Sequence, residues 1–298
     1  MLEIKGIINP TLTPMNEDET VNYDELAIQI NRVVEGGVHG VFVFGTNGEG
    51  YILSEEEKIE IMKIAVKEVN GRVPVYAQTG LIGTEDTIRL SQKAKEIGVD
   101  VLSLITPSFA AASQEELYTH FKTVAEAVDM PIVLYNIPAR AGNAIAPETV
   151  GRLSKIKNIV GVKDSSGNFD TILQYIEQTR DREDFSVLSG NDSLILWTLL
   201  AGGRGGVAGC SNVYPEVMSN IYEEFLKGNI DVARKNQDSI RSFRDCFKFG
   251  NPNTIVKHTV GMLGYPVGSC RSPFNIVSSE ATEALKLVLE KNKENGMK

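Results

Sequence analysis

Short apolar runs rich in Val, Ile and Leu recur along the chain, and amphipathic segments separate them. Continuous apolar character without strict alternation is typical of strands that are buried on both faces of a parallel sheet. We predict a strand in each of eight runs: Gly6–Thr13, Gly40–Thr46, Val73–Thr79, Asp100–Thr106, Pro131–Ile137, Ile159–Lys163, Phe185–Gly190 and Gly205–Gly209. Strands that alternate with helices in this way indicate an α/β protein.

The segments between the runs carry signals that start helices. Ser54 has Glu57 three residues later, and Ser113 has Glu116 at the same spacing. In this capping-box pattern the serine and the acid each bond a backbone N–H group at the start of a helix. No Pro/Ser-rich linker or change in composition divides the chain, so one (β/α)8 TIM barrel is a simpler arrangement than two doubly wound domains.

The strand pattern stops beyond about residue 228. Three segments then have helical character: Asp231–Phe247, Asn253–Leu263 and Ser278–Lys291. We therefore expect a (β/α)8 catalytic domain over residues 1–228 and a helical carboxyl-terminal region over residues 229–298.

Composition narrows the classes of ligand. The chain of 298 residues is 42% hydrophobic and 23% charged, which is typical of a soluble globular protein. A formal charge of −9 without a long basic run argues against a nucleic-acid surface, since phosphate binding needs clustered Lys and Arg. No apolar stretch is long enough for a membrane span, and the amino terminus lacks signal-peptide character. We expect a cytoplasmic protein that binds small molecules.

Cysteine and histidine are too sparse for a metal site. The cysteines Cys210, Cys246 and Cys270 are odd in number and widely spaced, which fits neither a disulfide framework nor structural zinc. The three histidines are isolated, with no grouping that could hold a catalytic divalent cation. We expect neither a metal nor a separate cofactor.

Lys163 is the first candidate for chemistry. It follows the run IVGV and precedes DSSG, so it falls at the carboxyl end of a strand, where α/β barrels place their active sites. An amine attacks a keto group only when it is unprotonated, and burial in a barrel disfavours the ammonium form. A Schiff-base lysine is one interpretation. A barrel lysine paired with a carboxylate, or one facing solvent, is the commoner situation for an isolated lysine.

Tyr135 favours the Schiff-base interpretation of Lys163. It lies 28 residues before Lys163, in the stretch PIVLYNIPAR, and it also ends a predicted strand. That strand neighbours the strand of Lys163 in the inferred barrel. A phenol near a Schiff-base nitrogen can carry protons during addition, dehydration and carbon–carbon cleavage. Taken alone, Tyr135 would be a core or rim aromatic residue.

A glycine-rich turn, Gly45–Gly50, follows the second predicted strand and contains Thr46 and Asn47. Glycines allow a tight turn with exposed N–H groups, which can hold an anion such as the carboxylate of a 2-oxo acid. An ordinary turn between strand and helix remains the alternative. The spacing is not that of the dinucleotide-binding G-x-G-x-x-G motif.

Three motifs in order, GTNGE at 45–49, YNIPAR at 135–140 and GVKDSSG at 161–167, resemble the dihydrodipicolinate synthase/N-acetylneuraminate lyase family. The similarity extends over essentially the whole chain, including SGND at 189–192 and the carboxyl-terminal NPNTIVKHTVGMLG. The resemblance implies a (β/α)8 barrel, class I aldolase chemistry without a metal, and a homotetramer built as a dimer of dimers.

The resemblance also assigns roles to residues. It implies that Lys163 forms a covalent Schiff base with the 2-oxo acid, that Tyr135 handles protons, and that Thr46 supplies the hydroxyl of a proton relay. Amides around Thr46 and Asn47 would take the pyruvate carboxylate. Two further backbone positions would line the pocket: Gly190 and Val207.

Arg140 favours the synthase branch of the family, which condenses pyruvate with aspartate semialdehyde in lysine biosynthesis. It matches the arginine that receives the carboxylate of the aldehyde in synthases, and a bidentate guanidinium suits that task. N-acetylneuraminate lyases generally carry an apolar residue there. A surface arginine paired with a nearby acid is the alternative.

Other positions favour a different reaction. Ser108 and Phe109 stand where typical synthases have tyrosines, and the second of these reaches across the tight dimer to complete the neighbour's relay. Phe109 cannot transfer a proton. Asn47 replaces the usual second threonine, as in 4-hydroxy-2-oxoglutarate-type aldolases. Ser193 stands where the lyases that cleave sialic acid have a glutamate for sugar hydroxyls, which disfavours cleavage of sialic acid.

Two alternatives to the synthase therefore remain. One is a retro-aldolase or dehydratase that acts on a 2-oxo-3-deoxy or 4-hydroxy-2-oxo acid, including an N-acetylneuraminate lyase-like enzyme. The other is a non-catalytic 2-oxo-acid-binding protein, which the presence of Lys163, Tyr135 and Thr46 disfavours.

Overall fold

The strands of the protein pair in chain order from β1 to β8 and close into a barrel. The computed structural model describes residues 2–297. The strands are β1 (Gly6–Pro10), β2 (Gly40–Val43), β3 (Val75–Gln78), β4 (Val101–Ile105), β5 (Ile132–Asn136), β6 (Ile159–Asp164), β7 (Ser186–Ser189) and β8 (Gly205–Val207). Each lies inside one of the predicted runs, except that β6 extends one residue beyond its run. The predicted fold class is thus confirmed.

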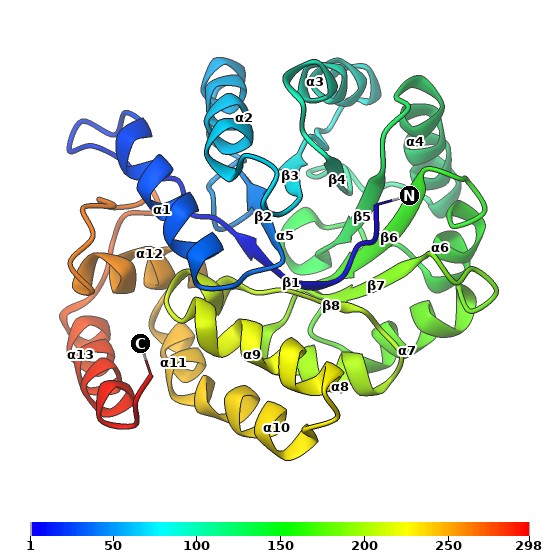
Figure 1. Ribbon diagram of the computed structural model, residues 1–298. Helices are drawn as coiled ribbons and strands as arrows, with labels where there is room; N and C mark the ends of the chain where they lie inside the picture. Colours follow the sequence, from blue (N-terminus) through cyan, green and yellow to red (C-terminus); the bar gives the residue numbers. More distant parts are fainter. Residues whose placement is uncertain (1, 298) are drawn as a thin grey trace. The chain divides into compact units, whose positions relative to one another are not determined.

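Helices alternate with these strands and then continue alone (Figure 1). The helices are α1 (Tyr23–Glu35), α2 (Glu55–Val69), α3 (Thr84–Ile97), α4 (Gln114–Ala127), α5 (Pro138–Ala141), α6 (Pro147–Leu153), α7 (Phe169–Gln178), α8 (Ile195–Leu200), α9 (Pro215–Leu226), α10 (Ile230–Ser239), α11 (Arg241–Asp245), α12 (Pro252–Met262) and α13 (Ser279–Glu294). Short 3-10 turns are η1 (Asp192–Leu194), η2 (Gly209–Asn212) and η3 (Cys246–Phe249).

The chain forms two compact units. The first unit contains the described residues up to Gly6 together with Pro74–Val207, and hence strands β3 to β8 with helices α3 to α8. The green strands β5, β6 and β7 lie side by side in Figure 1, and their side chains are buried on both faces. Burial on both faces explains why these strands are apolar throughout rather than at alternate positions.

The second unit contains Ile7–Val73 and the described residues from Ala208 onward. It holds β2, α1, α2 and the helices α9 to α13. Helices α9 and α10, yellow in Figure 1, pack against each other. The domain boundary expected near residue 228 falls between these two helices, and that division of the chain stays a prediction.

Both predicted capping boxes are present. The Ser54 amide donates to Glu57 Oε2 at 2.8 Å, and the Glu57 amide donates to Ser54 Oγ at 3.2 Å. Ser113 and Glu116 make the same reciprocal pair at the start of α4. These bonds satisfy N–H groups that have no partner inside a helix, so each helix begins where the sequence indicates.

The segment Asp231–Phe247 is helical, as predicted, but it is divided. Helix α10 ends at Ser239 and α11 begins at Arg241. Ser239 Oγ donates a hydrogen bond to the carbonyl of Asn236 at 2.8 Å, a contact that competes with regular helical bonding. The bend at this point accompanies burial of Ile240, which is only 1% exposed.

Within residues 2–297, every helix is too short or too polar to span a membrane. No three His, Cys, Asp or Glu side chains in this range are grouped so that they could hold a metal ion. The three cysteines are buried, and none of them forms a disulfide.

Candidate active site

Lys163 and Tyr135 face each other at the ends of neighbouring strands of the first unit. They occupy paired positions in the parallel register of β5 and β6. The Nζ atom of Lys163 lies 3.7 Å from the centroid of the Tyr135 ring. Lys163 is 5% exposed and Tyr135 is 2% exposed, so both functional groups lie in an interior that excludes most water.

The strand register that creates this pair is irregular. Ile132 pairs with Ile159, whereas the next residue, Val133, pairs with Gly161, so β6 has one extra residue at this point. A register change of one residue moves every later side chain to the opposite face of a sheet. The irregularity therefore decides that Tyr135 and Lys163 share a face.

The next pair along the two strands is joined directly. Asn136 Nδ2 donates to Asp164 Oδ1 at 2.7 Å, and Asn136 Oδ1 accepts from the Ile145 amide at 3.0 Å. Because side chains alternate along a strand, this pair lies on the opposite face from Tyr135 and Lys163. The bond fixes the register at the end of the strands where the reactive residues lie.

Asp164 is a buried carboxyl group beside the reactive lysine. It is 1% exposed, and Ser166 donates to its Oδ2 atom through both the amide, at 3.2 Å, and the hydroxyl, at 2.7 Å. Burial raises the pKa of Asp164, while the bonds from Ser166 and Asn136 act in the opposite direction. The carboxyl group is thus held by a complete set of partners in a poorly solvated place.

Gly190 lies against Lys163. Its amide donates to the carbonyl of Asp164 at 2.6 Å. A Cβ atom at this position would lie 2.9 Å from Lys163 Cε and would collide with Ser165 Oγ. A side chain larger than that of glycine would therefore displace Lys163 or Ser165, and the assignment of Gly190 to the pocket stays a prediction.

Two other predicted residues belong to the first unit but are placed differently. Val207 is the last residue of β8 and is 4% exposed. Its neighbour Gly206 pairs with Ser189, one residue before Gly190, so Val207 and Gly190 continue neighbouring strands. Arg140 lies on the short helix α5, four residues beyond the end of β5, and it is exposed. The Arg140 side chain is thus accessible to solvent, whereas Tyr135 is buried.

The turn Gly45–Gly50 lies in the second unit and carries Thr46 and Asn47, both partly exposed. The Glu49 amide donates to the Thr46 carbonyl at 3.2 Å, and the Gly50 amide donates to the Gly45 carbonyl at 3.2 Å. A Cβ atom added at Gly209 would lie 3.1 Å from Asn47 Nδ2, so this glycine borders the turn.

The loop after β4 presents Phe109 to solvent. Phe109 is 101% exposed and has a left-handed backbone, with φ of 77°. Asn143 holds the loop, because its Nδ2 atom donates to the carbonyls of Pro107 and Ala110 at 2.8 Å each. Its Oδ1 atom accepts from the Ala112 amide at 2.8 Å. The exposed aromatic ring is therefore displayed by an ordered loop.

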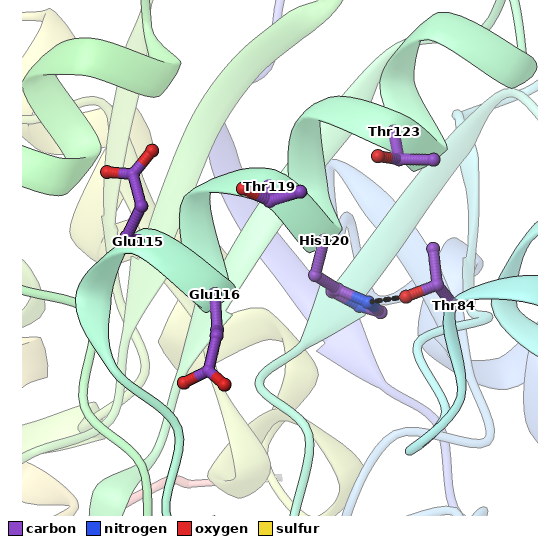
Figure 2. Close-up of a pocket in the computed structure, with 6 residues that line it drawn as sticks. All are labelled: Thr84, Glu115, Glu116, Thr119, His120 and Thr123. Atoms are coloured by element: carbon purple, nitrogen blue, oxygen red, sulfur yellow. Dashed lines mark hydrogen bonds between the residues drawn. The ribbon is translucent and has the colours of Figure 1, made fainter.

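A separate hollow of about 270 Å³ lies between α3 and α4, and none of the predicted site residues lines it (Figure 2). Thr84 and His120 make a 2.8 Å hydrogen bond there, drawn as the dashed line in Figure 2. Burial lowers the pKa of His120. Glu115 binds Arg152 and Glu116 caps α4, so both carboxylates in the hollow already have structural roles. We assign this hollow no chemistry.

A buried lysine beside a tyrosine, at the ends of neighbouring strands of an α/β barrel, is an arrangement that suits lyases in which a lysine amine attacks a carbonyl group. Comparison with known proteins agrees with that class. The chain belongs to the dihydrodipicolinate synthetase family, whose sequence model matches residues 3–292. The resemblance described from the motifs is confirmed.

Individual relatives are similar along their whole length. A 4-hydroxy-tetrahydrodipicolinate synthase of Bacillus velezensis is 38% identical over 97% of this chain and 99% of the relative. One of Methanopyrus kandleri is also 38% identical, over 97% and 96%. The crystal structure of dihydrodipicolinate synthase from Aquifex aeolicus has a TM-score of 0.93 at 34% identity, covering 97% of this chain and 98% of the other. YagE, an E. coli K12 prophage protein of this family solved with pyruvate, has a TM-score of 0.93 at 29% identity, covering 97% and 99%.

Sequence reasoning missed three residues that organise the first unit: Asn136, Asp164 and Asn143. The first two adjoin Tyr135 and Lys163 in the motifs, and their adjacency to reactive residues was an available signal. Polar residues at the ends of apolar strands require buried partners, and here they satisfy each other. Asn143 had no comparable signal, because its bonds go to backbone groups more than 30 residues away.

Proposed function

We propose that this protein is a 4-hydroxy-tetrahydrodipicolinate synthase that condenses pyruvate with aspartate semialdehyde through a Schiff base on Lys163. The observation that carries the proposal is the 3.7 Å approach of Lys163 Nζ to the Tyr135 ring, between two buried residues. The names of relatives that are 36% to 39% identical support this choice of reaction and its place in lysine biosynthesis.

The first half-reaction is the formation of an imine. The unprotonated amine of Lys163 adds to the keto carbon of pyruvate, a proton passes from nitrogen to oxygen, and water leaves as the C=N bond forms. Loss of a proton from the methyl group gives an enamine, whose carbon attacks the aldehyde of the second substrate. Tyr135 is the proposed proton carrier in these steps, with the Thr46 hydroxyl as a further member of the relay. No separate cofactor takes part in this proposal, because the imine on Lys163 itself accepts the electron pair that is left when the methyl group loses its proton.

Substrate carboxylates are assigned to two places. Amides around Thr46 and Asn47 are proposed to take the carboxylate of pyruvate, a role that suits the backbone N–H groups of a tight glycine-rich turn. Backbone groups at Gly190 and Val207 are proposed to line the pyruvate pocket. Arg140 is proposed to take the carboxylate of aspartate semialdehyde, because an exposed guanidinium can bind an incoming anion at two points.

We also propose a homotetramer built as a dimer of dimers. Phe109 is fully exposed on an ordered loop, and Leu173, Trp197 and Leu200 of α7 and α8 are 40%, 41% and 49% exposed. Exposed large apolar side chains support contact with another protein. Sedimentation velocity at micromolar concentration should give four times the chain mass of 32.6 kDa. A monomer would contradict the proposal. We place the protein in the cytoplasm, where buried thiols such as Cys210 stay reduced.

A second candidate function is a retro-aldolase or dehydratase that acts on a 2-oxo-3-deoxy or 4-hydroxy-2-oxo acid. The observation in its favour is Phe109, because its ring has no hydroxyl to complete a proton relay and its side chain is exposed. Such an enzyme would use the same Schiff base in the direction of cleavage or dehydration.

Two measurements test these proposals. Borohydride added with pyruvate should reduce the imine and add a pyruvyl-derived group to Lys163, detected by peptide mass spectrometry. An unmodified lysine in native protein would refute the Schiff base. A coupled assay of pyruvate with aspartate semialdehyde, run beside a pyruvate-release screen of sugar-derived 2-oxo acids, then separates the two reactions. Turnover in the second assay alone would reject the synthase.

A further inference from the structure

Glu49 ends the GTNGE motif in a conformation that its residue type disfavours. Its φ of 57° is in the left-handed region, which a residue with a Cβ atom seldom occupies. Phe44, at the other end of the same turn, also has a positive φ, of 39°. Such backbone persists only where surrounding contacts hold it, and it is common at functional sites. The contacts that hold Glu49 in this conformation therefore determine the shape of the turn between Phe44 and Glu49.

Those contacts come from the carboxyl-terminal part of the second unit. Lys257 Nζ, on α12, donates to Glu49 Oε1 at 2.7 Å, and the Arg271 amide donates to Glu49 Oε2 at 2.7 Å. The side chains of Lys257 and Glu49 are 1% and 0% exposed. A buried carboxylate with one oxygen bound to an ammonium and the other to an amide is fully satisfied.

The surroundings of this ion pair leave it little freedom. Cys270 lies beside it, and burial raises the pKa of its thiol to about 12. The Arg271 guanidinium binds Glu57 at 2.7 Å and the Glu19 carbonyl at 2.7 Å, which fixes the segment that supplies the amide. The segment that binds Glu49 is therefore itself fixed in position by the contacts of the Arg271 side chain.

The turn is also tightly packed against its own strand. A Cβ atom at Gly48 would lie 2.8 Å from both Phe44 Cα and the Thr11 carbonyl oxygen, and one at Gly50 would collide with the Phe44 carbonyl. Thr13 Oγ1 donates to the Gly48 carbonyl at 2.7 Å. These contacts restrict the backbone of the turn, but they do not involve the Glu49 side chain.

We propose that Glu49 is a positioning residue whose buried ion pair with Lys257, together with the Arg271 amide, holds the Thr46–Asn47 amides in the geometry that binds the carboxylate of the 2-oxo acid. The inference rests on the proposed function, since it assumes that this turn binds pyruvate. Glu49 itself does not contact the substrate in this arrangement. It acts through the backbone that it shares with Thr46.

The alternative is that the pair merely stabilises the second unit. Replacing one member of a buried ion pair leaves the other charge without its partner, and this lowers stability wherever the pair lies. A loss of stability alone would not separate the two roles. The concentration of pyruvate needed for half-maximal adduct formation does separate them, since a structural role leaves it unchanged in the folded fraction.

The test uses Glu49→Gln, which keeps the size of the side chain and an oxygen for the Arg271 amide. Borohydride trapping at increasing pyruvate, on protein verified as folded by circular dichroism, gives the half-saturating concentration. We expect it to rise by about 10-fold or more, with a smaller change in kcat at saturation, because misplaced binding groups weaken ligand capture. Lys257→Met should give a similar rise, and the double variant should show less than the product of the two effects because they remove one interaction.

A matched control is Glu25→Gln. Glu25 is another buried carboxylate of the second unit, 4% exposed, and it accepts a 2.6 Å bond from Gln29 within α1. This variant should lose stability without changing the half-saturating pyruvate concentration. An unchanged value in Glu49→Gln, or an equal rise in Glu25→Gln, would overturn the positioning role. If the unsubstituted protein forms no adduct, the proposed function fails instead, so the two failures are distinguishable. Should Glu49→Gln not fold, Lys257→Met supplies the same comparison.

Discussion

Asn136 Nδ2 lies 2.7 Å from Asp164 Oδ1 and joins the two residues that directly follow Tyr135 and Lys163. This bond comes after the place where the pairing of β5 with β6 shifts by one residue. The strands could otherwise continue in more than one register, and only one register places Tyr135 beside Lys163. The bond between Asn136 and Asp164 on one face of the strands thus fixes the register that brings Tyr135 and Lys163 together on the other face.

Asn136→Ala should lower both stability and activity. It removes one partner of a buried carboxyl group, which costs about 1–3 kcal/mol, and it loosens the register next to the reactive residues. We expect a lower urea midpoint and a kcat reduced by about 10-fold or more at saturating pyruvate. The matched control is Asn158→Ala. Asn158 Nδ2 donates to the carbonyls of Ala125 and Val128 at 2.9 and 3.0 Å, and Asn158 directly precedes β6, at the other end of the strand from Lys163. Equal loss of kcat in both variants would contradict the role of Asn136.

Asp164 should make stability depend on pH. Burial raises the pKa of this carboxyl group, so the folded protein keeps the proton at pH values where the unfolded chain has lost it. Its contribution to stability is therefore fully present below the ordinary pKa of aspartate and decreases as pH rises through the folded-state pKa. The Asp164→Asn variant lacks this pH-dependent contribution to stability.

Urea unfolding across pH 3 to 8 or so measures that difference. The free energy of unfolding of Asp164→Asn, taken relative to the unsubstituted protein at each pH, should increase as pH rises from the acid end of the range. Other carboxylates cancel in this comparison because both proteins contain them. Two parallel curves would show that the folded-state pKa of Asp164 is not raised.

Tyr135→Phe should separate the ring from its hydroxyl. The ring that lies 3.7 Å from Lys163 Nζ is retained, while the group that carries protons is lost. Because a positioned acid–base group contributes about 100-fold or more, kcat should fall by that order. The reduced pyruvate adduct should still form on Lys163 at long incubation times. Stopped-flow trapping with borohydride measures the rate, and an unchanged rate would assign proton transfer to another group.

Arg140→Ala should affect only the second substrate. A guanidinium bound to a carboxylate contributes about 1.5–3 kcal/mol, which corresponds to an increase of about 10- to 100-fold in the KM for aspartate semialdehyde. Half-saturation by pyruvate in the trapping assay should not change. Arg152→Ala is the control, because Arg152 is another exposed arginine of the first unit and binds Glu115 at 2.8 Å. No change with Arg140→Ala would favour the retro-aldolase or dehydratase.

The strands and helix starts could be predicted because their causes are local. A strand such as Ile159–Asp164 is apolar throughout since both of its faces are buried, and a capping box such as Ser54 with Glu57 satisfies its own helix. Lys163 and Tyr135 stood out because reactive side chains at strand ends contrast with the apolar residues before them. Each of these signals lies within about ten residues of the feature that it predicts.

The rest could not be predicted because it depends on distant contacts. Nothing in the run Pro131–Ile137 reveals that pairing with β6 shifts after Ile132. The left-handed backbone of Phe109 follows from bonds that Asn143 makes to its loop, 34 residues further along the chain. In the same way, the GTNGE motif predicts a turn, but it does not reveal that Lys257 binds its glutamate.

The separation between Glu49 and its partners also has a consequence for synthesis of the chain. Lys257 is 208 residues and Arg271 is 222 residues away in sequence, so both are made long after the turn has left the ribosome. Contacts between such distant residues form slowly, because a long loop must close first. The ion pair and the amide contact that hold Glu49 therefore form only when most of the chain has been made.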